Sequence, residues 1–399
     1  MVAFGDIADF RNGLNYNRQN FGRGLKVVSV ADFGDRRVPD YSSLGEINPD
    51  GVATEEDLLT DGDLLFVRSN GNRALVGRVL FVEAPPIEVG FSGFCIRARV
   101  HRAIANPKYY SYFFRSKAAR DALSSGGTGA SIQSISQGAL KSVFVPLPSI
   151  KSQLQTVAVL QPYDDLIEKN QRRIKLLEEA ARRLYREWFV ALRFPGHERV
   201  KVVDDVPQGW SQGNALGFVK VLSGGTPKTD VDNYWNGGIP FFTPKDCPNE
   251  FLVTSTEKTL TDTGLTNCNS RLFPKETIFI TARGTVGKLA LSQRPMAMNQ
   301  SCYAVVAATP FNNLFLFLAL LDGVAHFKQV ASGGVFDAIV IDTFKLIPFL
   351  LPPAALTEQF GDRVRPVFDQ MEVLTIASER LKQARDALLP RLMSGALAV

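Results

Sequence analysis

The sequence contains an internal repeat at an offset of about 206 residues, and this repeat limits the possible folds more than any other feature. Residues 146–153 (PLPSIKSQ) correspond to residues 352–359 (PPAALTEQ), and residues 64–68 (LLFVR) correspond to residues 278–283 (IFITAR). Each of the latter segments leads into a glycine-containing turn. The period is far longer than the roughly 20–50 residues of a solenoid unit. The repeat therefore predicts two copies of one domain in tandem.

Length and composition agree with this organisation. The chain has 399 residues, of which 45% are hydrophobic and 21% are charged, which is typical of globular domains that bury their own cores. The formal net charge is +5 and the pI is about 8.9. A mild positive excess suits a protein that meets DNA on one face. It is equally common in proteins that bind no nucleic acid, so the charge leaves both alternatives open.

A charged helical segment with a heptad pattern follows each proline-containing joint. In the first segment, apolar side chains at two positions of the heptad predict a coiled-coil seam. These positions are Ile167, Ile174, Ala181 and Trp188, and Asn170, Leu177, Leu184 and Ala191. The second segment repeats the pattern with Leu374, Leu381 and Leu388, and with Ala377 and Ala384, whose small side chains would let two helices approach closely. The alternative is that each helix packs on its own domain. Asn170 either fixes the register of the pair or occupies a frayed end.

The remaining segments predict mixed α and β structure in each copy. In the first copy, segments rich in β-branched and aromatic residues predict strands at 26–30, 63–68, 76–82 and 93–100, and a helix follows at 107–123. In the second copy we expect strands at 277–282, 288–291 and 302–306, and a buried helix over 311–330. The predicted fold class is therefore two α/β (α+β) domains in tandem, separated by two long helices that pair with each other as a coiled coil. The predicted boundaries are 1–148, 149–194, 195–351 and 352–399.

Motifs of the common enzyme classes are missing from the sequence. There is no P-loop, no Gly-x-Gly-x-x-Gly opening a helix, no Asn/Asp-Pro-Pro-Tyr, no His-Glu-x-x-His and no Asp/Glu-x-Lys triplet. The sequence therefore predicts neither a catalytic residue nor a metal site. Four scattered cysteines, none in a Cys-x-x-Cys pair, fit a reducing cytoplasm. The N-terminus does not resemble a signal peptide, and the most apolar stretch, 311–321, is too short to cross a bilayer.

Two loops carry side chains that suit DNA contacts. In the first copy, a strand runs into residues 68–78 (RSNGNRALVGR). Arginine can bond guanine, asparagine can bond adenine, and both can contact phosphate. Asn70-Gly71 also suits a plain hairpin turn. The candidate residues here are Arg68, Ser69, Asn70, Asn72 and Arg73.

In the second copy, residues 224–246 form a loop that glycine and proline hold in shape, and residues 283–288 (RGTVGK) are the counterpart of the Arg68 turn. Tyr234 and Trp235 are expected to pack this loop rather than to stack on bases. The candidate DNA contacts in this copy are Thr226, Lys228, Thr243, Lys245, Arg283, Thr285 and Lys288.

Together these segments resemble the specificity (S) subunits of type I restriction–modification systems. The resemblance is carried by the GGTP…YWNGGIP…TPKD run in 224–246, by VRSNGNRALVG in 67–77, and by LEEAARRLYREWF in 177–189. The order of the parts matches over essentially the whole chain. One departure is that the first domain lacks the GGTP…YW signature, which predicts that the two domains read different half-sites.

The resemblance implies a non-catalytic DNA-recognition subunit that reads a bipartite, asymmetric site. It also implies that the two long helices form an antiparallel coiled coil and act as a spacer. It implies two DNA methyltransferase (M) subunits and motor–nuclease restriction (R) subunits as partners, with S-adenosylmethionine, ATP and Mg on those partners and no cofactor on this chain. A helix of about 27 residues is about 40 Å long, and one turn of B-DNA is about 34–36 Å, so such a spacer sets the gap between half-sites. Rival interpretations are a coiled-coil protein–protein adaptor without DNA specificity and a nuclease with an unrecognised centre.

Overall fold

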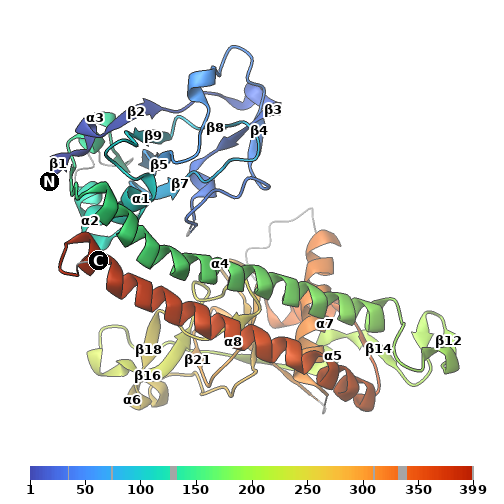
Figure 1. Cartoon of the computed structure of the whole chain (residues 1–399). Helices are drawn as coiled ribbons and strands as arrows, with labels where there is room; N and C mark the ends of the chain where they lie inside the picture. Colours follow the sequence, from blue (N-terminus) through green and yellow to red (C-terminus); the bar gives the residue numbers. More distant parts are fainter. Residues whose placement is uncertain (35, 73–74, 126–132, 309–310, 331–338, 398–399) are drawn as a thin grey trace. The chain divides into compact units, whose positions relative to one another are not determined.

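The computed structural model describes residues 1–34, 36–72, 75–125, 133–308, 311–330 and 339–397. The chain divides into two compact units. Unit 1 comprises Met1–Asp165 and Leu381–Val399, and unit 2 comprises Leu166–Arg380. The two longest helices, α4 (Ile150–Tyr185, green in Figure 1) and α8 (Ala354–Met393, red), each contribute residues to both units.

Unit 1 is built on an antiparallel sheet with the strand order β2-β9-β5-β7. Its strands are β2 (Ala8–Asn12), β9 (Cys95–Val100), β5 (Leu64–Val67) and β7 (Val79–Phe81). A second sheet has the order β4-β3-β8, with β4 (Gly45–Ile47), β3 (Phe21–Val28) and β8 (Val89–Phe91). Two short pairs complete the unit: β1 (Val2–Ala3) with β11 (Phe144–Val145), and β6 (Ser69–Asn70) with β10 (Gln133–Ser134).

The predicted helix over 107–123 is two helices, α1 (Pro107–Arg115) and α2 (Lys117–Ser125). The start is as expected, since Pro107 occupies the first turn and the Asn106 side chain accepts a hydrogen bond from the Tyr109 amide. Ser116 interrupts the helix because its backbone is extended, with ψ of 148°, and its hydroxyl then caps α2 by accepting from the Ala119 amide at 3.3 Å. A third, short helix is α3 (Gln137–Lys141).

The core of unit 1 lies between the central sheet and α1. Phe114 of α1 packs against Phe66 of β5 and against Phe4, with ring centroids 4.9 Å and 4.7 Å apart, and all three side chains are fully buried. Burying a side chain of this size stabilises the fold by roughly 1.5–3 kcal/mol.

Unit 2 repeats this arrangement on a larger scale. Its main sheet has the order β15-β22-β19-β20-β17, and its second sheet has the order β18-β16-β21. The main strands are β15 (Val219–Ser223), β22 (Cys302–Ala307), β19 (Ile278–Thr281), β20 (Leu289–Ser292) and β17 (Leu252–Val253). The second sheet contains β18 (Lys258–Leu260), β16 (Trp235–Phe242) and β21 (Ala297–Met298). Two pairs flank them: β12 (Val202–Val203) with β13 (Val206–Pro207), and β14 (Ser211–Asn214) with β23 (Pro348–Leu351).

The long helix of unit 2, α7 (Asn313–Val330), is apolar on all sides near its start, where Phe315, Leu316 and Phe317 are fully buried. This confirms that the most apolar stretch of the sequence is a core helix. The short helices of this unit are α5 (Ala215–Phe218) and α6 (Asp262–Thr266). The strands predicted at 277–282, 288–291 and 302–306 are confirmed as β19, β20 and β22.

The internal repeat is confirmed by the strand order, and it extends to an irregularity that the sequence did not reveal. In unit 1, Phe21 and Leu25 of β3 both pair with Ile47, so the intervening residues bulge out. In unit 2, Trp235 and Ile239 of β16 both pair with Leu260 in the same way. β3 also runs parallel to β8, as β16 does to β21. The two domains therefore share one frame, including the same bulge.

The alignment of Arg68 with Arg283 is wrong by one residue. Val67 pairs with Cys95, and its counterpart Thr281 pairs with Cys302. The next residues, Arg68 and Ala282, donate their backbone N–H to the carbonyls of Phe94 and Ser301 at 2.8 Å. Arg68 therefore corresponds to Ala282, and Arg283 corresponds to Ser69. The sequence alignment matched the two arginines because they are the same residue type, but the strand register places them on opposite sides of the pleat.

Helix α4 begins well before the first heptad position, so its 36 residues exceed the expected 27. Within unit 2, Ile167, Ile174, Ala181 and Trp188 are buried, while Leu177, Leu184 and Asn170 are only half-buried and Ala191 is exposed. On α8, Leu374 is buried and Leu381 and Leu388 are half-buried. The small residues do not line a close approach, because Ala377 is half-buried and Ala384 is exposed. Met371 and Ser378, which belong to the neighbouring heptad position, are buried instead.

In the described part of the chain, no helix combines the length and the apolar character needed to cross a membrane.

Candidate nucleic-acid interface

In unit 1, the predicted reading loop begins where β5 ends, and its first residues are engaged in the fold. The Arg68 side chain is half-buried and donates from Nη1 to the Gly93 carbonyl oxygen at 3.2 Å. Ser69 and Asn70 form β6 and pair with β10. The Asn70 side chain accepts a hydrogen bond from the Asn72 amide at 2.8 Å, so it shapes the turn as expected. Of these candidates, Asn72 is exposed, and Arg73 lies outside the described residues.

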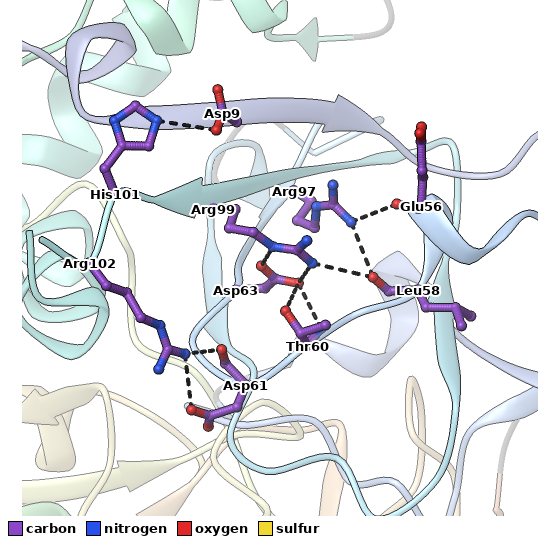
Figure 2. A network of polar contacts seen from close by, with 10 residues as sticks. All are labelled: Asp9, Glu56, Leu58, Thr60, Asp61, Asp63, Arg97, Arg99, His101 and Arg102. Carbon is purple, nitrogen blue, oxygen red and sulfur yellow. Dashed lines mark hydrogen bonds and ion pairs between the residues drawn. The ribbon is translucent and has the colours of Figure 1, made fainter.

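Several arginines of unit 1 that a sequence search would take as a basic patch are engaged by the fold (Figure 2). Arg97 donates from Nη1 to the carbonyl oxygens of Glu56 and Leu58, at 2.8 Å and 3.1 Å. Arg99 forms a two-point ion pair with the fully buried carboxylate of Asp63, at 2.7 Å and 2.8 Å. This hydrogen bond raises the pKa of Arg99. Arg97 and Arg99 thus hold the loop that precedes β5 against β9. We therefore assign them a structural role in the fold rather than a contact with DNA.

In unit 2, the turn at 299–301 gathers the candidate residues along one edge of the domain. The Gly225 amide donates to the Met298 carbonyl at 3.1 Å, which places Thr226 beside this turn. The Asn299 amide donates to the Phe242 carbonyl at 3.0 Å, which brings in Thr243 and the residues after it. Ala282 donates to Ser301 at 2.8 Å, which brings in Arg283. Segments far apart in the sequence therefore meet here. Four of the candidate residues are exposed on these segments: Thr226, Lys245, Arg283 and Thr285.

The other candidates of unit 2 have more specific local roles. Thr243 donates from its hydroxyl to Asp246 at 2.6 Å and closes the loop. Lys288 is half-buried and donates to the Asn249 side chain at 2.7 Å. Lys228 is exposed.

Trp235 packs its loop, as the sequence suggested. Its Nε1 donates to the Lys228 carbonyl at 3.1 Å, and its ring lies edge-on to Phe241 with centroids 5.5 Å apart. These contacts fix the loop that presents Thr226 and Lys228.

Sequence reasoning missed residues in both units. Gln300 is exposed at the turn of unit 2, and its side chain accepts a hydrogen bond from the Thr226 hydroxyl. In unit 1, Asn15 and Arg18 are exposed before the β3 bulge, and Arg23 is exposed within it. The glycine-rich run at 22–24 was a usable signal, because it matches the position of Asn236-Gly-Gly in the second bulge.

The described residues contain no group of three or more His, Cys, Asp or Glu placed to hold a metal ion. Burial raises the pKa of the Cys95 and Cys302 thiols, and it raises the pKa of Cys247 to about 11. These thiols are therefore held in the neutral form, which is a poor nucleophile.

Comparison with known proteins gives a consistent result. The model of the type I restriction modification DNA specificity domain matches the chain twice, over residues 1–179 and 207–382. A putative type I restriction enzyme MjaX specificity subunit of Methanocaldococcus jannaschii is 23% identical, covering 98% of this chain and 91% of that protein. The MjaIX specificity subunit of the same organism is 25% identical over 90% of this chain and 84% of its own length.

A solved structure shares the fold. The S subunit of a type I restriction–modification system from M. genitalium superposes with a TM-score of 0.56 at 13% identity, covering 98% of this chain and 95% of that one. The two family matches also disfavour the interpretation as an adaptor without DNA specificity. The chain belongs to the family of type I restriction–modification specificity subunits, which are non-catalytic and direct such systems to DNA.

Proposed function

We propose that this chain reads a bipartite, asymmetric DNA site, one half with each recognition domain. The observation that carries the proposal is the contrast between the domains. The four main strands of the first domain have counterparts in the same order in the second domain, which adds β17, and both domains have the same bulge, but the side chains at the corresponding edge differ. A shared frame with different contact residues reads different bases. We propose the following contacts: Arg68, Ser69, Asn70, Asn72 and Arg73 in the first domain, and Thr226, Lys228, Thr243, Lys245, Arg283, Thr285, Lys288 and Gln300 in the second.

We further propose that α4 and α8 pair as an antiparallel coiled coil that acts as a spacer. Contacts within each unit support this. In unit 2, Trp188, in the π-helical turn Arg186–Val190 that continues α4, lies edge-on to Phe360 near the start of α8, with ring centroids 5.5 Å apart. In unit 1, Asp164 of α4 pairs with Arg385 near the end of α8 at 2.6 Å. Residues late in one helix thus meet residues early in the other, which is the order that antiparallel pairing requires.

The domain boundaries that we propose are 1–148 and 195–351 for the recognition domains and 149–194 and 352–399 for the spacer segments. Partners of this chain are then double-stranded DNA, two methyltransferase subunits, and restriction subunits that carry the motor and nuclease. Those partners bind S-adenosylmethionine, ATP and Mg. The cytoplasmic location expected from the cysteines stays a prediction.

The test is to co-express the full chain with its methyltransferase subunit and to map methylated bases by sequencing the host genome. We expect methylation at a split motif whose halves differ, and none when this chain is omitted. In the same assay, Arg283→Ala should relax one position of one half, at a cost of about 1–3 kcal/mol. If all sequences weaken alike, Arg283 contacts phosphate only. Methylation at one continuous motif, or at a perfect palindrome, would contradict the proposal.

A further inference from the structure

Each unit contains the same tight turn in front of the second strand in the order of its main sheet, β9 in unit 1 and β22 in unit 2. In unit 1 the turn runs from Ser92 to Cys95, where the Cys95 amide donates to the Ser92 carbonyl at 2.8 Å. In unit 2 it runs from Asn299 to Cys302, with the matching hydrogen bond at 3.3 Å. The first side chain caps the turn in both, because Ser92 Oγ accepts from the Phe94 amide and Asn299 Oδ1 accepts from the Ser301 amide. Gly93-Phe94 and Gln300-Ser301 therefore occupy equivalent tips.

A neighbouring glycine fixes the position of each turn. A β-carbon on Gly13 would lie 2.3 Å from the Ser92 carbonyl oxygen, and one on Gly224 would lie 2.3 Å from the Met298 oxygen. No β-carbon fits at this distance. The residue that directly follows β2 or β15 can therefore lie this close to the turn only if it is glycine. The first domain thus keeps the initial glycine of the Gly-Gly-Thr-Pro motif, although the rest of the motif differs.

The tips themselves are built differently, and the difference involves a second residue. In unit 1, the Asn15 side-chain oxygen lies 2.5 Å from the place where a β-carbon on Gly93 would be, so that position cannot extend a side chain outward. Phe94 is the exposed side chain instead, with 63% of its surface accessible. In unit 2, the equivalent of Asn15 is Thr226, whose hydroxyl donates to Gln300 and steadies it. Each tip thus presents one side chain, an aromatic ring in one domain and an amide in the other.

The tips sit among the proposed DNA contacts. The Phe94 carbonyl accepts the backbone N–H of Arg68, and the Ser301 carbonyl accepts that of Ala282, next to the exposed Arg283. Arginines beside a protruding tip can hold the phosphate backbone while the tip enters a groove. In the major groove, an apolar side chain contacts the methyl group of thymine, and a glutamine amide matches N6 and N7 of adenine.

We propose that these turn tips read bases directly, Phe94 through a thymine methyl group in one half-site and Gln300 through an adenine in the other. The proposal rests on the DNA-reading function proposed above and adds the residue and base class at each half. Isolated exposed apolar residues are common on protein surfaces, so the test compares Phe94 with another exposed phenylalanine. Phe144 in β11, 66% exposed, is the matched control, and Gln212 in β14, also exposed, is the control for Gln300.

The experiment maps methylated motifs for the complex of the full chain with its methyltransferase, carrying F94A, F94L, F144A, Q300A, Q300E or Q212A. F94A should relax one A·T position of one half-site, with discrimination there falling about ten- to hundredfold, while F94L retains it because leucine still reaches the methyl group. Q300A should relax one A·T position of the other half-site. Q300E should move the preference there toward cytosine, whose amino group a carboxylate accepts. F144A and Q212A should leave both halves unchanged.

Three results would overturn the assignment. The first is an unchanged motif for F94A and Q300A in complexes whose thermal unfolding matches that of the wild type. The second is that F94A and Q300A relax base preference in the same half-site. The third is relaxation at a G·C position. In each case the wild-type complex would still methylate its bipartite motif, so the failure of this assignment is distinct from failure of the DNA-reading function.

Discussion

At the scale of single residues, Glu178 is the buried acid with the most marked consequence for stability. It lies on α4 within unit 2, and its carboxylate accepts the backbone N–H of Phe251 at 2.6 Å. Burial raises the pKa of Glu178 to about 7. The hydrogen bond from Phe251 and the nearby charges of Arg182 and Lys175 oppose the shift, and Glu250 adds to it. Because the ordinary value is 4.5, the folded protein retains a proton here that the unfolded chain releases.

This shift predicts a pH-dependent stability. The stabilising contribution of protonated Glu178 is complete below about pH 4.5 and is lost as the pH rises through about 7. At about 1.4 kcal/mol per unit, the loss is roughly 3 kcal/mol. Glu178→Gln keeps the oxygen that Phe251 contacts but cannot ionise. We therefore expect the melting temperature of the variant to exceed that of the wild type by several degrees at pH 8 and to approach it at pH 5.

The control for this measurement is Glu179→Gln, on the exposed side of the same helix, where the carboxylate pairs with Arg183. It should change the melting temperature little at either pH, because exposed pairs one helical turn apart contribute about 0.3–0.5 kcal/mol. Equal pH dependence in wild type and Glu178→Gln would show that Glu178 is ionised in the folded state.

Single residues also show how far the sequence could lead. The residue types of the interface were visible, because Arg, Asn, Thr and Lys cluster in two loops. Which of them also contact other parts of the protein was not, because those partners lie far away in the sequence. Arg68 donates a hydrogen bond to Gly93, and Lys288 donates one to Asn249. Gln300 carried no local signal, since its role follows from Thr226, which only the fold brings next to it.

At the scale of elements, apolar strands were predictable and polar ones were not. Leu64–Val67 and Ile278–Thr281 stand out because all their residues are buried. Strands β3 and β16 are glycine-rich at their exposed ends, and the bulges there break the alternation that marks a strand. The break between α1 and α2 was hidden for a similar reason, since serine at 116 is unremarkable in a helix until its backbone turns outward.

The long helices are attached to their domains by different interactions. Asp164 and Phe368 occupy the same position relative to the start of α4 and α8. Asp164 is buried and accepts a hydrogen bond from the Tyr112 hydroxyl at 2.7 Å, in addition to its pair with Arg385. Phe368 stacks on Phe251 with centroids 5.9 Å apart. The two copies of the repeat therefore attach the long helix at the same helical position but through different kinds of contact. Sequence similarity alone could not have revealed this difference.

If the helices form the proposed spacer, their length sets the gap between half-sites. Duplicating residues 167–173 in α4 and 374–380 in α8 adds one heptad to each helix, about 10 Å at 1.5 Å per residue. At about 3.4 Å per base pair, the gap should grow by about three base pairs while both half-sites stay the same. Methylation mapping of the modified complex measures this.

A seven-residue insertion in the turn between β12 and β13 provides the control, since this hairpin is outside both long helices. It should leave the gap as it is. An unchanged gap after the paired heptad insertion, in a complex that still methylates, would contradict the role of the helices as a spacer.

At the scale of the whole molecule, the direction in which the two proposed spacer helices pair decides how the two similar domains face the DNA. Antiparallel helices are related by a two-fold axis, so domains attached to equivalent ends face the DNA in inverted orientation. Helices that run parallel would instead present the two domains in the same orientation. The natural chain hides this difference, because its two domains carry different tips, Phe94 and Gln300, and an asymmetric motif results either way.

A chain with identical domains makes the choice visible. We expect a variant in which residues 195–351 replace residues 1–148 to direct methylation to an inverted repeat of the second half-site, with the wild-type gap. The converse variant, with two copies of the first domain, should give an inverted repeat of the other half-site. A direct repeat in either case would show that the helices run parallel, and a motif with only one defined half would show that a domain reads DNA only in its own position. The inverted repeat is expected from the proposed antiparallel pairing, which the contact of Trp188 with Phe360 within unit 2 and that of Asp164 with Arg385 within unit 1 support.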